Sequence, residues 1–134
     1  MKFITLSVAV FCICICSYSQ NLIGYKGKDV MKYMKANHKD MNYIKVINNK
    51  FSYLKYSDNM DNQTILFFLN SDSICRSVRV ICDMSIKPLK VKELDKLYTK
   101  SDDNKWIDKH DGKTYIIDIM DSSWSCVISY ESEK

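Results

Sequence analysis

Cysteine and arginine side chains make SICRSVRVICD the most reactive-looking stretch of this sequence. Cys75 and Cys82 enclose Arg76 and Arg79, and a third cysteine, Cys126, lies near the end of the chain. These residue types and their spacing suggest three kinds of site, namely a redox pair, a metal site or an anion-binding loop. The residues RSVRVI between the two cysteines show no turn signal, which predicts a strand over 73–84 rather than a loop.

A strand would separate the reactive side chains of this stretch. Extended chain rises about 3.3 Å per residue, so Cys75 and Cys82 would lie roughly 23 Å apart and point to opposite faces. They therefore cannot bond to each other or share a metal ion. Arg76 and Arg79 would also point opposite ways, so they form no single anion clamp.

The histidines and serines show no catalytic pattern. His38 in NHKDM and His110 in DKHDG each lie among lysine and aspartate, which is typical of surface histidines. No paired-histidine spacing suggests zinc. No G-x-S-x-G or glycine-rich phosphate loop is present, and the chain has only three glycines. The sequence therefore favours a protein that is not an enzyme and needs no cofactor or metal.

The N-terminal residues are typical of an export signal. Lys2 supplies a positive charge, residues 3–15 form an apolar run, and Ser17 and Ser19 are small residues at the cleavage positions. The run is too short to span a membrane comfortably. We therefore expect a signal peptide over 1–19, cleavage between Ser19 and Gln20, and one domain over 20–134 that is secreted or periplasmic.

A lipid anchor is the alternative for this end of the chain. Cys12, Cys14 and Cys16 all lie in the predicted signal. A large residue precedes each of them where lipoprotein processing prefers a small one, so simple secretion is favoured.

The charge pattern argues against nucleic acid as a partner. The formal net charge is only +4, and basic and acidic residues are interspersed. No basic cluster with interleaved aromatic residues is present, which is the pattern that a nucleic-acid surface would need.

An internal repeat appears when the chain is shifted by 63 residues, so that 28–71 faces 91–134. Identities are few, but apolar positions coincide, as when Leu54 and Tyr56 face Ile117 and Ile119. Two turn signals also coincide, Asn48-Asn49 and Asp111-Gly112, and both need positive φ. The sequence therefore predicts a duplicated unit of one helix followed by strands.

The expected elements follow from this repeat. We expect helices over 27–37 and 89–100, hairpins over 42–57 and 105–120, third strands over 63–69 and 124–131, and the fourth strand over 73–84 in the first copy alone. The order αββββαβββ predicts an α+β fold, with a single antiparallel sheet and helices on one face.

The quoted elements resemble a group of small secreted modules. YKGKDVMKYM followed by FSYLKY and TILFFL, with the echo VKELDKLY, KTYIID and CVISY, is similar to the BLIP-like, PepSY-like and BamE-like helix-and-meander modules. In those folds a similar unit often occurs twice, and most members are not enzymes. The resemblance implies a binding or inhibitory role outside the cytoplasm.

The predicted sheet is apolar on both faces. Tyr43, Leu54, Tyr56, Trp106 and Ile117 mark the helix-covered core face. The opposite face carries a second apolar set, Ile44, Phe51, Tyr53, Leu66, Phe68 and Ile116. A one-sided sheet would alternate apolar with polar residues.

We expect this second face either to be covered by loops or the N-terminal segment, or to bind a protein. Pairing at a sheet edge is a third route to a partner. A secreted, non-catalytic interaction module is therefore the leading hypothesis. The alternatives are a self-associating envelope protein and, less favoured, an enzyme with an unrecognised site.

The alternation of the strands also sorts the cysteines. Cys82 shares the more apolar side of its strand, whereas Cys75 falls on the more polar side. Cys126 shares a side with Ile128 and Tyr130, which the repeat marks as core. In an oxidising compartment this predicts a Cys82–Cys126 disulfide that joins the halves, or a Cys75–Cys126 disulfide if a one-residue bulge intervenes.

Overall fold

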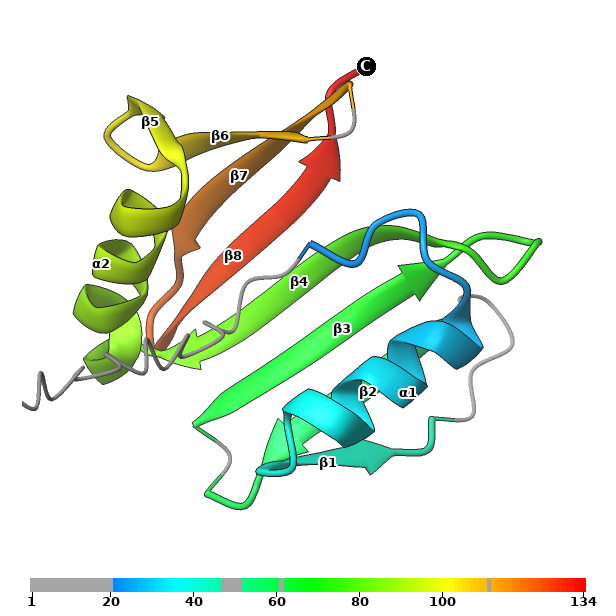
Figure 1. The fold of residues 1–134 in the computed structure, drawn as a ribbon. Coiled ribbons are helices and arrows are strands. Elements are labelled where there is room, and N and C mark those ends of the chain that lie inside the picture. Colours follow the sequence, from blue (N-terminus) through cyan, green and yellow to red (C-terminus); the bar gives the residue numbers. More distant parts are fainter. Residues whose placement is uncertain (1–20, 47–51, 61, 111) are drawn as a thin grey trace, which may run out of the picture.

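One antiparallel sheet of eight strands carries two helices on a single face (Figure 1). The computed structural model describes residues 21–46, 52–60, 62–110 and 112–134. The elements in chain order are α1 (Gly27–Asn37), β1 (Met41–Ile44), β2 (Tyr53–Asp58), β3 (Gln63–Leu69), β4 (Cys75–Asp83), the short helix η1 (Met84–Ile86), α2 (Lys87–Leu97), β5 (Thr99–Asp102), β6 (Lys105–His110), β7 (Lys113–Asp121) and β8 (Ser125–Ser132). The predicted α+β class is confirmed.

An additional strand, β5, corrects the predicted order to αββββαββββ. Its sequence, TKSD, contains no apolar residue, so it lacks the alternation that predicts a strand, and every position is exposed. It is a strand because it pairs with β6 at the edge of the sheet. The duplication stays a prediction, because the shift of 63 aligns β1 with β6, whereas β5 is the strand that follows the second helix.

The strands lie in the order β1-β2-β3-β4-β8-β7-β6-β5. Each of the two helices is followed along the chain by four strands that pair in sequence order. The two four-stranded groups meet where β4 pairs with β8. β8 therefore holds the centre of the sheet, with β4 on one side and β7 on the other (Figure 1).

The core lies between the helices and one face of the sheet, which we call the inner face. One row of directly opposed residues crosses six strands, and all of them are buried: Leu54, Phe67, Val78, Tyr130, Ile117 and Trp106. Val30 and Met34 of α1 and Leu94 of α2 are buried in the same cluster. The core positions predicted in the two hairpins are thus confirmed, except Tyr43.

Tyr43 lies on the inner side but is 46% exposed. It belongs to β1, which is an edge strand and has a neighbour on one side only. Its ring packs against Tyr56 at a centroid distance of 5.5 Å, and no further strand lies beyond it in the sheet. Its assignment to the core was therefore wrong.

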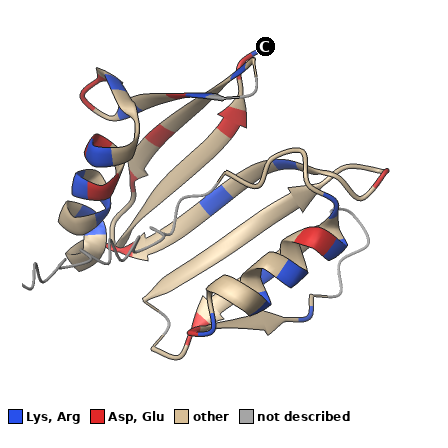
Figure 2. Ribbon diagram, viewed as in Figure 1, with Lys and Arg blue, Asp and Glu red and all other residues tan. Residues whose placement is uncertain are grey.

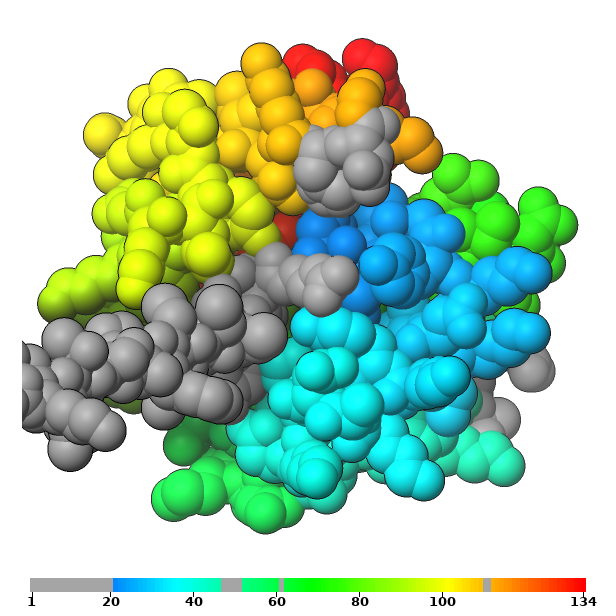
Figure 3. Space-filling view, viewed as in Figure 1, coloured from blue at the N-terminus to red at the C-terminus, as the bar shows by residue number. Residues whose placement is uncertain are grey.

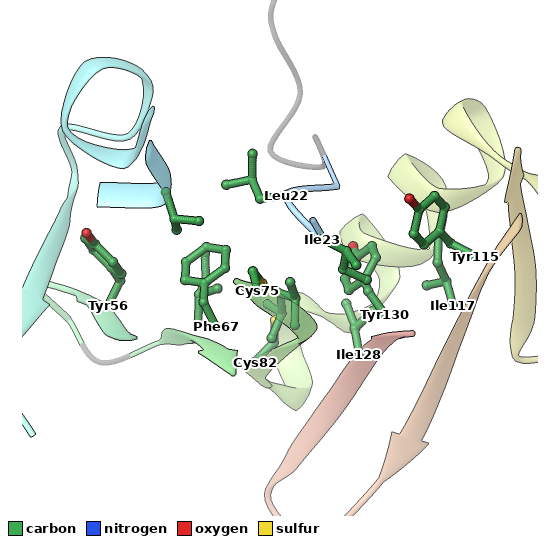
Figure 4. Close-up of a cluster of buried hydrophobic side chains, with 14 of the residues drawn as sticks. Leu22, Ile23, Tyr56, Phe67, Cys75, Cys82, Tyr115, Ile117, Ile128 and Tyr130 are labelled. Atoms are coloured by element: carbon green, nitrogen blue, oxygen red, sulfur yellow. The ribbon is translucent and has the colours of Figure 1, made fainter. Parts of the chain in front are cut away.

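The segment at 21–26 fills the space between the two helices (Figure 3). Leu22 and Ile23 are buried in the core, above the sheet (Figure 4). Gly24 N–H donates to the Cys75 carbonyl at 2.8 Å, and Cys75 N–H donates to the Tyr25 carbonyl at 2.8 Å. Gly24 has a φ of +94°, a backbone conformation that glycine adopts without strain.

Two predicted features lie outside the described residues. The signal peptide over 1–19 is one, and the Asn48-Asn49 turn is the other. Within the part of the chain that the structure describes, no helix is long and apolar enough to cross a membrane.

Candidate interaction surface

The face of the sheet opposite the helices, which we call the outer face, is rich in apolar side chains. Strand pairing aligns Tyr53, Phe68, Ser77, Glu131, Ile116 and Ile107 in one row across it. The apolar members of the outer face are Ile44, Tyr53, Leu66, Phe68, Ile81, Ile107, Ile116, Met120 and Val127.

Solvent reaches this face along its whole width. Met120 is 67% exposed, Ile44 and Ile116 are more than a third exposed, and the other apolar members are partly exposed. Both helices lie on the other side of the sheet (Figure 1). Among the described residues, therefore, no helix covers the outer face.

An aromatic group occupies the β2–β3 part of the outer face. The Tyr53 and Phe68 rings are tilted, with centroids 5.8 Å apart. The Arg79 guanidinium lies 5.4 Å from the Phe68 centroid, a favourable cation–π distance. β3 itself carries no charged residue (Figure 2). Aromatic residues and arginine together are typical of the centres of protein interfaces.

Charges of both signs lie on the outer face. Lys55, Arg79 and Asp83 lie on β2 and β4. Asp118 and Glu131 lie on β7 and β8, with Lys105 and Lys109 of β6 beyond them. Close to the β4–β8 pair, Arg79 therefore lies on one side, and Asp118 and Glu131 lie on the other.

Trp124 is the most exposed large apolar residue among those described, at 86%. It lies in the tight turn between β7 and β8, where Ser122 N–H donates to the Ser125 carbonyl at 2.8 Å. The strand predicted over 124–131 included Trp124, so its place in an exposed turn was not predicted. A tryptophan within the polar run DSSWS was the signal that could have found it, because tryptophan is rarely left exposed without a partner.

The two edges of the sheet are poorly suited to pairing with another chain. β1 and β5 have four residues each, and β5 is polar throughout. Short and charged edge strands are a common protection against unwanted strand pairing. The outer face is therefore a better candidate site than the edges.

His38 is buried, at 6% exposure, so its prediction as a surface residue was wrong. It ends α1, where its N–H donates to the Met34 carbonyl at 2.9 Å and its carbonyl accepts from Met41 N–H at 3.0 Å. In this turn the His38 ring lies beside the Tyr33 ring, with 5.7 Å between the ring centroids. Burial lowers the pKa of His38, and the charge of Asp40 opposes that effect.

A small cavity adjoins the His38 ring. It has a volume of about 30 Å³, room for about one or two water molecules. Asn21, Phe67 and Tyr130 help to line it, and none of its lining residues is a carboxylate. His110 is elsewhere, at the end of β6 opposite Lys113. The arrangement around His38 is therefore that of a buried polar residue in an apolar core.

The three cysteines of the described chain are all buried and are present as free thiols. Cys82 lies directly opposite Cys126 in the β4–β8 pair. A bulge gives β4 an extra residue, Arg76, and so moves Cys75 to the inner face. Cys75 nevertheless lies seven residues along the strand from Cys82, so the alternative Cys75–Cys126 pairing does not fit this register.

No metal centre emerges from the side chains that the structure describes. Among these residues, no group of three or more histidine, cysteine or acidic side chains is placed to hold an ion. Of the predicted interaction residues, Ile44, Tyr53, Leu66, Phe68 and Ile116 all lie on the outer face. Phe51 lies outside the described residues.

Comparison with protein-family models, with curated proteins and with solved structures gives no match for this chain.

Proposed function

We propose that this protein is a non-catalytic interaction module that acts outside the cytoplasm and binds a protein partner through its outer face. The observation that carries the proposal is the partly exposed apolar outer face, from which both helices are absent. A sheet with one solvated face normally has polar residues there. Contiguous apolar surface at such a place is typical of binding sites.

The position of the reactive side chains supports binding over catalysis. His38, Cys75, Cys82 and Cys126 are all buried in the core. A substrate in solution would not reach them without opening the fold. The outer face offers aromatic, aliphatic and charged groups, which suit recognition of another protein surface.

The resemblance to BLIP-like, PepSY-like and BamE-like modules is consistent with this role. The expected export signal would bring the domain to a compartment where such modules act. A partner that fits the outer face would present an apolar patch, with an acidic group opposite Arg79 and a basic group opposite Asp118 and Glu131.

Capture of partners by the purified protein, with cross-linking in its native extracellular or envelope fraction, tests the proposal. Phe68→Glu removes the ring that packs against Tyr53 and Arg79 and puts a charged side chain in the aromatic group of the outer face. It should therefore reduce capture by tenfold or more. The matched control is Leu89→Glu, since Leu89 is an exposed apolar residue of α2 on the helix side.

Two outcomes of this experiment would contradict the proposal. Equal capture by the wild type and Phe68→Glu would remove the outer face from the binding site. A loss of capture with both Phe68→Glu and Leu89→Glu would point to a general effect of added charge instead.

Self-association through the same face is a second candidate, and the opposite charges on the two sides of the β4–β8 pair favour it. Rotation of a second copy by 180° about the strand direction would bring Arg79 of one copy close to Asp118 and Glu131 of the other. Such a contact uses the same patch on both copies, as two-fold dimers do. The outer face would then be the inner layer of a two-sheet sandwich.

A further inference from the structure

Cys82 and Cys126 are placed where a covalent bond between them is within reach. They are direct partners in the β4–β8 pair, and both point to the inner face, where they are buried. The Cα atoms of opposed residues in antiparallel strands lie about 4.5 to 5.5 Å apart. Disulfides bridge Cα separations of about 4.4 to 6.8 Å.

The hydrogen-bond pattern shows which kind of strand pair they form. Met84 N–H donates to the Trp124 carbonyl at 3.4 Å. Continuing the register by two residues from Cys82 opposite Cys126 places Met84 opposite Trp124. On the other side of β4, Asp83 N–H donates to the Asn62 carbonyl at 2.9 Å. Because the pattern alternates along a strand, Cys82 and Cys126 form a hydrogen-bonded pair.

This kind of pair has a consequence for the bond. Side chains in hydrogen-bonded pairs lie further apart than in the other kind, whereas a disulfide draws the two Cβ atoms to about 3.8 Å. Closing the bond would therefore strain the strands. Strained disulfides are more easily reduced than relaxed ones, and many of them are labile.

A charged residue of α2 lies close to this pair. Lys90 is buried, with its Nζ 3.5 Å from Glu93 Oε2. Burial raises the pKa of Cys82 to about 12, while the Lys90 charge acts in the opposite direction. Burial is the larger effect and Glu93 adds to it. The thiolate that attacks a disulfide therefore forms readily only when the pair is opened to solvent.

We propose that Cys82 and Cys126 form a reversible disulfide that joins the two halves of the sheet across the β4–β8 pair. The oxidant is a disulfide donor, either oxidised glutathione or a thiol–disulfide oxidoreductase. One cysteine loses its proton and attacks the donor, which gives a mixed disulfide and releases one donor thiol. The second cysteine then loses its proton and displaces the other donor thiol.

The exchange balances in electrons and protons. The two protein thiols lose two electrons and two protons, and the donor disulfide takes them up to become two thiols. Because both cysteines are buried, the exchange takes place before β4 and β8 close on each other, or when they open. It needs no binding partner at the outer face, so it stands independently of the proposed function.

Equilibration of the purified protein in glutathione buffers tests the proposal. The buffers run from fully reduced to fully oxidised, free thiols are then alkylated in denaturant, and each cysteine is followed by peptide mass spectrometry. In the oxidised buffers we expect a linked Cys82–Cys126 peptide and alkylated Cys75. In the reduced buffers we expect all three to be alkylated in the denaturant, and the reduced protein to be folded before the denaturant is added.

Cys75 provides the matched control, since it is the third buried cysteine and its Sγ donates to the Ser77 carbonyl at 3.6 Å. Cys75→Ala should leave the linked peptide unchanged, whereas Cys126→Ala should abolish it. Alkylation of Cys82 and Cys126 in every buffer would overturn the proposal. A linked peptide that persists in the fully reduced buffer would overturn its reversibility.

Discussion

Burial governs the chemistry of the reactive side chains in this protein. Burial raises the pKa of the Cys75 thiol to about 11, and it also raises the pKa of Cys126 and of the Tyr130 phenol. It lowers the pKa of His38. In every case the neutral form is favoured, which suits side chains that contribute to a core rather than to catalysis.

The lowered pKa of His38 predicts a pH dependence of stability. The unfolded chain binds a proton at His38 near the ordinary value of 6.5, whereas the folded chain resists protonation to lower pH. The unfolded state therefore binds more protons as the pH falls below 6.5, so the free energy of unfolding decreases there. Denaturant titrations at pH 7.5 and 5.5 should show this loss.

His38→Gln is the variant that isolates the effect. It keeps a polar side chain at the end of α1 but has no proton to gain, so its free energy of unfolding should change less between the two pH values. An equal loss of stability in the variant and the wild type would assign the effect to other groups.

Local periodicity could predict some side-chain positions but not others. The alternation of VRVIC placed Cys82 on the core side, and Cys126 was placed there by Ile128 and Tyr130. The position of Cys75 depends on a bulge at Arg76, which no residue of the sequence announces. His38 is buried because α1 ends there and the chain turns inward, and that direction depends on the packing of α1 against the sheet.

Polar contacts link α2 to the second half of the sheet. At the surface, Lys87 Nζ lies 2.7 Å from Asp121 Oδ2 of β7. Trp106 of β6 is fully buried, and its indole N–H donates to Asp95 Oδ1 of α2 at 2.9 Å. α2 buries only Lys90 and Leu94 among its residues. A helix with so little apolar surface in the core depends more on such contacts than a strongly amphipathic one.

Removal of the hydrogen bond between Trp106 and Asp95 should lower the stability of the protein measurably. Asp95→Ala leaves the buried indole N–H without its acceptor, so we expect the free energy of unfolding to fall by about 1 to 2 kcal/mol. Urea denaturation followed by tryptophan fluorescence measures it. The control is Asp103→Ala, an exposed aspartate beside β5, which should change stability by less than about 0.5 kcal/mol.

The predictability of the elements follows their apolar pattern. The helix over 27–37 was predicted with its observed bounds from the repeat, in which Met31 and Met34 face Leu94 and Leu97, and its buried apolar residues are Val30 and Met34. β3 was also predicted with its observed bounds as an apolar run over 63–69. β5 could not be predicted, since an exposed edge strand of sequence TKSD owes its conformation to β6 alone.

The opposite charges on the two sides of the β4–β8 pair predict how two copies of the protein would associate. If two copies meet as described, Arg79→Glu brings like charges together, and so does Glu131→Arg. Each variant alone should be monomeric in sedimentation at low salt, where screening is weak. An equimolar mixture of the two variants should regain the dimer, because opposite charges then face each other.

The mixture distinguishes self-association from other effects of the substitutions. A wild-type protein that sediments as a monomer at all concentrations would exclude the dimer and leave the heterologous partner as the remaining proposal. A mixture that stays monomeric while the wild type dimerises would place the interface away from these two residues.

The candidate site was visible in the sequence only in part. Alternation placed Tyr53, Leu66 and Phe68 on a second apolar face, and the structure has them there. The contributions of Met120 and Trp124 depend on where β7 ends and on the shape of the following turn. Whether loops or the N-terminal segment also cover the second face is a property of the assembled fold, so the sequence left it open.

The central place of β8 has a consequence for the timing of folding. β8 is the last of the eight strands to be synthesised, yet it pairs with both β4 and β7. As synthesis proceeds, the four strands around α1 can pair, but the two halves cannot join until residue 132 has emerged. Transport across a membrane by threading needs an unfolded chain. For a protein that we propose to be exported, a sheet that closes only with β8 keeps the chain open for threading until residues 125–132 have been made.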